Sequence, residues 1–213
     1  MKISFIGGGN MASALIAGLA GKFTSGSNIH VVDPNPEALE RLRQAHGVTV
    51  AHEIGDDVRT SGVVVLAVKP QQMHEAAALL LPQLGAGTLV LSIAAGIRGA
   101  DLSRWLGGHR AIVRTMPNTP ALIGRGITGL VAMDGVSEAQ KTAADAIMKA
   151  AGQTVWLDDE ALIDPVTAVS GSGPAYVFYF LEAMQQAAVE LGLSAEQGRE
   201  LAVATFAGAA ELA

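Results

Sequence analysis

Residues 3–12 read ISFIGGGNMA, and the fold of the chain is predicted outward from this stretch. The residues before the first glycine are typical of a short buried strand over 2–6, and a helix of small residues is predicted over 11–21. Gly7, Gly9 and Ala12 have the spacing of the G-x-G-x-x-G/A dinucleotide fingerprint. The first glycine permits a tight turn, the second leaves no Cβ in the path of a pyrophosphate, and the alanine lets the helix lie close to the sheet. The unpaired N–H groups at the start of that helix then face the phosphates.

The sequence after this turn completes a βαβ unit. A second apolar strand is predicted over 29–32, and Asp33 follows it, roughly 20 residues beyond the glycines, where the fingerprint has an acidic residue. A carboxylate at this position accepts hydrogen bonds from the ribose hydroxyls of NAD and repels the 2′-phosphate of NADP. No arginine follows within the loop, so chemistry alone favours NAD.

Composition excludes several classes of function. Half of the 213 residues are hydrophobic and 16% are charged, so a sizeable core is expected and disorder is not. The net charge of −6 argues against nucleic acid, and no apolar run reaches the roughly 18 residues of a membrane span. The chain has no cysteine, and its five histidines are never spaced as metal ligands, so we expect neither disulfides nor a metal site. A cytoplasmic location is expected because nothing marks export.

Apolar strand patterns and helical patterns alternate up to residue 157. Eight strands are expected, over 2–6, 29–32, 48–51, 63–68, 88–93, 111–115, 128–133 and 155–157. This order predicts an α/β fold, in which a Rossmann-like, doubly wound, mostly parallel sheet fills residues 1–160. An all-α domain is expected over 161–213, with long helices over 175–191 and 195–213 and a loop at 170–174. Two helices cannot enclose a core alone, so they imply a partner or further sequence.

In such a sheet, ligands bind at the carboxyl ends of the strands. Lys69 and Pro70 follow an apolar strand, and the lysine is either a cation facing the cofactor or a solvated loop residue. Asn118 stands between two prolines, where its amide either meets a ligand or stabilises its own turn.

Four motifs together resemble the pyrroline-5-carboxylate reductases, the last enzymes of proline synthesis. They are Val68–Gln71 (VKPQ), Ser92–Gly96 (SIAAG), Arg114–Pro120 (RTMPNTP) and Ser170–Tyr176 (SGSGPAY). The resemblance runs without interruption along the whole sequence. It implies the reduction of L-1-pyrroline-5-carboxylate to L-proline by NAD(P)H, with NADP used more often than NAD. It also implies a homodimer or higher homo-oligomer formed through the helical domain.

The resemblance and the strand ends together give the candidate site residues. The cofactor-binding candidates are Ile6, Gly7, Gly8, Gly9, Asn10, Met11, Asp33, Asn35, Ala67, Val68, Lys69, Pro70, Ile93, Ala94 and Ala95. On the substrate side the candidates are Glu160, which matches an acidic residue near the family's substrate, and Asn118. No residue is identified as a catalytic acid or base.

The sequence departs from the family at two places. Family members commonly have a small or amide side chain where Asp33 stands, which bears on the choice between NADP and NAD. The family's Ser-Pro-Gly-Gly-Thr-Thr-like substrate loop, which follows the second long helix, is not in this sequence. We therefore expect this 213-residue form to bind a dinucleotide with little or no turnover.

Two other functions stay open. A β-hydroxyacid dehydrogenase shares the N-terminal fold, but its catalytic lysine follows a Gly-x-Gly turn, and Val177 has that spacing after Gly171-x-Gly173. The other is a non-catalytic NADP-binding sensor.

Overall fold

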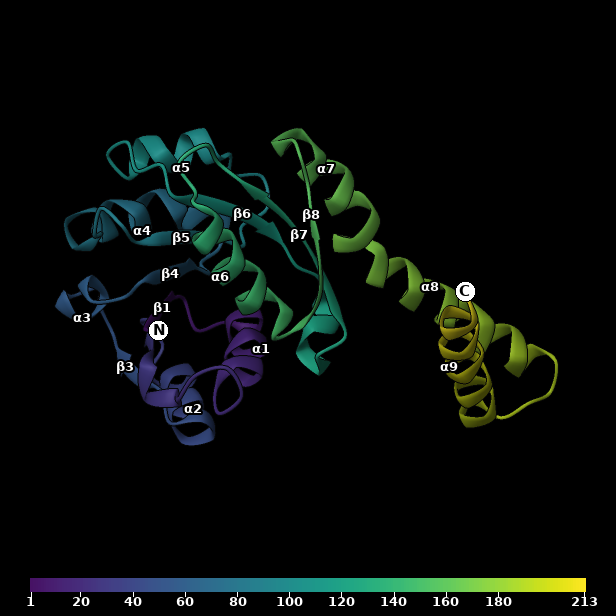
Figure 1. Ribbon diagram of the computed structural model, residues 1–213. Helices are drawn as coiled ribbons and strands as arrows, with labels where there is room; N and C mark the ends of the chain where they lie inside the picture. The colour runs from purple at the N-terminus through teal and green to yellow at the C-terminus, as the bar shows by residue number, and fades with distance from the viewer. The chain divides into compact units, whose positions relative to one another are not determined.

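The computed structural model describes all 213 residues, which form two compact units, Met1–Gly171 and Ser172–Ala213 (Figure 1). The first unit contains an eight-stranded sheet with helices on both faces, and the second contains two long helices. This confirms the predicted α/β fold followed by an all-α segment. The domain boundary expected after residue 160 stays a prediction.

The strands lie in the order β3-β2-β1-β4-β5-β6-β7-β8. Their bounds are β1 Ile3–Ile6, β2 Ile29–Val32, β3 Thr49–Ala51, β4 Val63–Leu66, β5 Leu89–Ser92, β6 Ile112–Met116, β7 Gly126–Ala132 and β8 Gly152–Trp156. All neighbours are parallel except β6 and β7. The strand order reverses between β1 and β4, so the crevice for a ligand lies at the carboxyl ends of these two strands.

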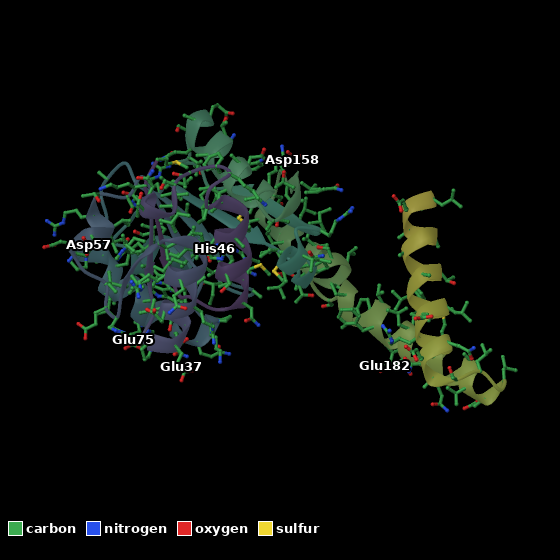
Figure 2. All side chains as sticks on the ribbon, turned by 90° about the horizontal axis from the view of Figure 1, so that it is seen from below. Glu37, His46, Asp57, Glu75, Asp158 and Glu182 are labelled. Atoms are coloured by element: carbon green, nitrogen blue, oxygen red, sulfur yellow. The ribbon has the colours of Figure 1, made fainter.

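The helices of the first unit fill the connections between strands. They are α1 Asn10–Leu19, α2 Pro36–His46, α3 Asp56–Arg59, α4 Met73–Leu80, α5 Gly99–Trp105, α6 Glu138–Lys149 and α7 Ile163–Val166. Asn35 caps α2, and Gly47 ends it in the left-handed conformation. Ser137 and Gln140 form the predicted capping box of α6. Charged side chains such as Glu37, Asp57 and Glu75 lie on the outside of this unit (Figure 2).

Both faces of the sheet are covered, which explains the continuous apolar strands. On one face Phe5 and Val65 pack with residues of α1, α2 and α6, and on the other Ile6 and Leu66 pack with residues of α3, α4 and α5. Figure 1 shows α4 and α5 next to each other on the sheet. Alternate residues of one strand thus enter two different cores.

Two predictions of local structure were wrong. The last strand begins at Gly152 rather than Val155. Glycine lets this strand pair closely with β7, because a Cβ at Gly152 would lie 2.0 Å from the carbonyl oxygen of Gly126. The predicted loop at 170–174 is largely helical, since a π-helix spans Thr167–Gly171 and α8 begins at Gly173.

The second unit consists of α8 Gly173–Glu190 and α9 Ala195–Leu212. The rings of Phe180 and Phe206 meet between them with centroids 6.3 Å apart, and Ser194 and Gln197 form the second predicted capping box. No residue of α8 is buried. No helix of the structure has the length and apolar content needed to cross a membrane.

Candidate dinucleotide site

The first glycine turn joins three strand ends. The N–H of Gly7 donates a hydrogen bond of 2.8 Å to the carbonyl oxygen of Val32 at the end of β2. The φ of Gly7 is +104°, and a Cβ there would lie 2.6 Å from the carbonyl oxygen of Ala67, just beyond β4. Only glycine fits this position, because both its conformation and its contact exclude a side chain.

The next glycine is bonded to Asp33. The N–H of Gly8 donates to Oδ2 of Asp33 at 2.7 Å, and the N–H of Asn35 donates to Oδ1 of the same carboxylate at 2.8 Å. The side-chain oxygen of Asn35 in turn accepts hydrogen bonds from the N–H groups of Glu37 and Ala38 at the start of α2. Asp33 therefore ties the glycine turn to α2, a role that the sequence fingerprint did not suggest.

Gly9 is the residue where the turn opens to a ligand. It is exposed, it precedes α1, and a Cβ built on it would meet no heavy atom within 4 Å. No side chain caps α1, and no acidic residue lies in its first turn. The free N–H groups and the positive end of the helix dipole therefore fit an anionic diphosphate.

The other candidate cofactor residues follow β4, which lies beside β1 in the sheet, and β5, which lies beside β4. The N–H of Ala67 donates to the carbonyl oxygen of Ile6 at 2.8 Å, and that of Ala94 donates to Oγ of Ser92 at 3.4 Å. Lys69 is exposed, and its ammonium group has no partner within the chain. The structure thus brings the candidates from 6–11, 33–35, 67–70 and 93–95 to one edge of the sheet.

Asn118 is buried and bonded at both ends of its amide. Its Nδ2 donates to the carbonyl oxygen of Ser170 at 3.1 Å, and its Oδ1 accepts from the N–H of Ile127 at 3.0 Å. These contacts support the interpretation that the amide stabilises the surrounding loops.

Glu160 is held by two donors that the sequence did not identify. Its Oε1 accepts hydrogen bonds from the N–H of Gly99 at 2.6 Å and from Nη1 of Arg114 at 2.7 Å. A cavity of about 370 Å³ lies here, lined on its other sides by Gly96, Arg98 and residues after Glu160. No short spacing joins these partners in the sequence, so only the folded chain shows the pair.

A larger cavity, of about 620 Å³, lies between α6 and the end of the sheet. Burial raises the pKa of Asp145 in its wall, but hydrogen bonds from Lys149, Thr154 and Trp156 outweigh burial and leave the pKa lowered. The bonds from Thr154 and Trp156 fasten α6 to β8, away from the glycine turn. No group of three or more His, Asp or Glu side chains in the structure is placed to hold a metal ion.

A doubly wound sheet whose first glycine turn opens onto an uncapped helix defines the class of Rossmann-type dinucleotide-binding proteins. Residues 2–96 match the family model described as NADP oxidoreductase coenzyme F420-dependent, and residues 160–213 match the model for pyrroline-5-carboxylate reductase dimerisation. The chain belongs to the pyrroline-5-carboxylate reductase family, because it is 46% identical over 212 residues to a reductase of that name.

Curated relatives establish this membership. The pyrroline-5-carboxylate reductase of Pseudomonas aeruginosa is 46% identical over 212 residues, which cover 100% of this chain and 78% of the relative. That of Escherichia coli is 36% identical over 213 residues, covering 99% and 78%. The predicted family resemblance is therefore confirmed.

Solved structures agree with the sequence relatives. A pyrroline-5-carboxylate reductase from Coxiella burnetii superposes with a TM-score of 0.93 at 38% identity, covering 99% of this chain and 78% of that one. The Plasmodium falciparum enzyme with NADP bound gives 0.88 at 29% identity, covering 100% and 78%. A 3-hydroxyisobutyrate dehydrogenase from Mycobacterium tuberculosis, at 19% identity and a TM-score of 0.62, shares the fold alone.

Proposed function

We propose that this chain reduces L-1-pyrroline-5-carboxylate to L-proline, with NADPH as the hydride donor. The observation that carries the proposal is the open, uncapped turn at Gly9 in a chain 46% identical over its full length to a reductase of this name. The Plasmodium falciparum relative, solved with NADP bound, supports the choice of dinucleotide. NADH is the second candidate, because the carboxylate of Asp33 lies at the end of β2, where it repels a 2′-phosphate.

When bound, the nicotinamide would supply a hydride to the imine carbon of the pyrroline ring, which becomes C5 of proline, and the ring nitrogen takes up a proton. An imine that is protonated in this way is already electrophilic, so the chain needs chiefly to align the two reactants and to exclude water. This agrees with the absence of a base bonded to an orienting partner at the strand ends.

The candidate site residues form groups according to the strand that each of them follows. The turn from Ile6 to Met11 holds the diphosphate with backbone N–H groups. Asp33 and Asn35 lie at the adenosine ribose, since they follow β2 on one side of the turn. The segments 67–70 and 93–95 follow β4 and β5 on the other side and hold the nicotinamide half. Glu160 and Asn118 shape the substrate side through the bonds described above.

We also propose that the helical unit forms a homodimer or a higher homo-oligomer. Phe178 and Tyr179 of α8 are 58% and 73% exposed. Contact between α8 and α9 alone does not bury such side chains, since no residue of α8 is buried. The match of residues 160–213 to a dimerisation model supports this assembly. A reducing compartment such as the cytoplasm suits a chain without cysteine.

The test measures NADPH binding by calorimetry and then NADPH oxidation in the presence of pyrroline-5-carboxylate. The assay uses the complete gene product, because this chain spans 78% of the Pseudomonas aeruginosa relative. We expect binding and substrate-dependent oxidation, with proline as the product. Binding without oxidation would favour the sensor instead, and oxidation of a β-hydroxyacid in place of proline formation would favour the dehydrogenase.

A further inference from the structure

The turn from β5 to α5 is held at its two ends. At the start, Oγ1 of Thr115 donates to the carbonyl oxygen of Ser92 at 3.1 Å, and Oγ of Ser92 accepts from the N–H of Ala94. At the far end, the N–H of Gly99 donates to Glu160. Ile93–Ala95, which the proposed function places at the nicotinamide, lies between these anchors.

The tip of the same turn, Ala95 and Gly96, has little support of its own. Both residues are exposed, and a Cβ at Gly96, where φ is +74°, would meet nothing within 4 Å. Beside the tip, Ala94 is buried and Ile93 and Ile97 pack against the two cores. The position of the turn therefore depends on this packing and on the hydrogen bonds at its two ends.

The anchor at Glu160 is a part-buried, charge-assisted one. Arg114 on β6 is 4% exposed, and the side chain of Glu160 is 24% exposed. A single oxygen, Oε1, accepts from both Nη1 of Arg114 and the N–H of Gly99. Such hydrogen bonds are stronger than neutral ones, and the carboxylate also meets the positive end of α5.

Gly99 itself cannot move freely. A Cβ there would lie 2.5 Å from Sδ of Met133, so the start of α5 lies directly against the residue that follows β7. Glu160 thus joins the end of the turn to β6, while Met133 limits its movement on the other side.

We infer that Glu160 is a positioning residue for the nicotinamide-side turn, acting through Gly99 and fixed by Arg114, and does not itself contact the substrate. The inference deepens the proposed function and rests on it. Glu160 keeps Ile93–Ala95 in the position at which the nicotinamide ring faces the imine carbon. The diphosphate turn at Gly7–Met11 has separate supports, Val32 and Asp33, so cofactor affinity and ring placement are distinct properties of this chain.

The test replaces Glu160 by glutamine in the complete gene product, which is also the unaltered protein of the comparison. The substitution keeps the size of the side chain and removes its charge. For Glu160→Gln we expect kcat to fall about tenfold, because a small misplacement of reacting groups costs that much. The Kd for NADPH should change less than about threefold, since the diphosphate turn is intact. Hydrogen–deuterium exchange of the cofactor-free protein should quicken over 93–99 and stay unchanged over 7–11.

Glu40→Gln is the matched control. Glu40 is also bonded to an arginine, accepting from Nε and Nη2 of Arg43 at 2.8 Å, but the pair is exposed on α2. This control should change neither kcat nor the exchange of 93–99. Arg114→Lys serves if Glu160→Gln fails to fold, because it keeps the buried cation and loses the planar donor group. Arg114→Lys should also lower kcat while the Kd for NADPH changes less than about threefold, and its loss of kcat should be smaller than that of Glu160→Gln.

The outcomes separate the two proposals. If the unaltered protein turns over its substrate and a folded Glu160→Gln variant keeps kcat within twofold, that result overturns the positioning role and the proposed function stands. Unchanged exchange over 93–99 does the same, as does a loss that lies wholly in the Kd for NADPH. Absence of turnover in the unaltered protein overturns the proposed function and, with it, this inference.

Discussion

The carboxylate of Asp33 accepts a hydrogen bond from the N–H of Gly8 across 2.7 Å, and this bond joins the end of β2 to the turn after β1. Its other oxygen accepts from the N–H of Asn35, which caps α2. Asp33 therefore shapes the glycine turn through the protein's own hydrogen bonds. The proposed function places its charge beside the ribose, so we expect this one residue to influence both the stability of the turn and the choice of dinucleotide.

Replacing this carboxylate should separate the two effects. Asp33→Ser leaves the N–H groups of Gly8 and Asn35 without their acceptor, and the free energy of unfolding should fall by about 1–3 kcal/mol. The ratio of KM values should shift in favour of NADPH over NADH, because the negative charge is lost. Asp33→Asn, which keeps one acceptor, should show the same shift in ratio with a smaller loss of stability. An unchanged KM ratio in both variants would remove Asp33 from dinucleotide choice.

Loss of the Asn118 amide should destabilise the first unit. Asn118→Ala removes the partners of the Ser170 carbonyl and the Ile127 N–H, so we expect a loss of about 1–3 kcal/mol in denaturant unfolding. Asn28→Ala is the control, because its amide makes a single part-buried bond to Thr24. Equal stability of the two variants would contradict the structural role of Asn118.

His30 should make stability depend on pH. Burial lowers its pKa from 6.5 against an opposing effect of Asp57, its Nδ1 is bonded to Thr49, and its Nε2 is buried without a partner. The unfolded chain thus binds a proton more readily than the folded one. In the pH window between the lowered pKa and 6.5, the free energy of unfolding therefore rises with pH, and it falls as the pH drops below 6.5. Urea unfolding across this window should show a weaker dependence in His30→Asn. Parallel curves for the two proteins would contradict this assignment.

A charge on the exposed face of α8 should prevent self-association. Phe178→Asp should give a smaller particle in light scattering, because a carboxylate cannot be buried in an apolar interface without large cost. Leu79→Asp is the control, since Leu79 is 57% exposed on α4 of the first unit, close to the 58% of Phe178. If both variants keep the mass of the unaltered protein, α8 is not the interface.

The strand pattern and the glycine turn were readable from sequence for clear physical reasons. Strands covered on both faces leave continuous apolar runs, as in Val63–Leu66, and the turn needs glycine at Gly7 because no side chain fits. The carboxyl ends of such strands meet at one edge, and this rule together with the family resemblance gave the candidate cofactor residues as a set.

The remaining features depend on contacts between distant segments. Arg114 and Glu160 are 46 positions apart and meet only because β6 and the segment after β8 are brought together. β8 begins with Gly152 and Gln153, which carry no apolar pattern, so its start was misplaced. The helical turns at 163–171 were missed because Ser170 and Gly171 are typical of loops, while Oγ of Ser170 here bonds back to the carbonyl oxygen of Val166.

The most direct test of the central claim is NADPH binding to Gly9→Ala, measured by calorimetry beside a thermal melt. Gly9 has φ −72° and ψ −174°, which alanine adopts freely, and its Cβ would meet no protein atom within 4 Å. The melting temperature should therefore stay unchanged while the Kd for NADPH rises at least about tenfold, because the methyl group occupies the path of the diphosphate. Gly7→Ala, by contrast, should lose stability, since its Cβ would lie 2.6 Å from the carbonyl oxygen of Ala67. A Gly9→Ala protein that binds NADPH as tightly as the unaltered chain would contradict the account.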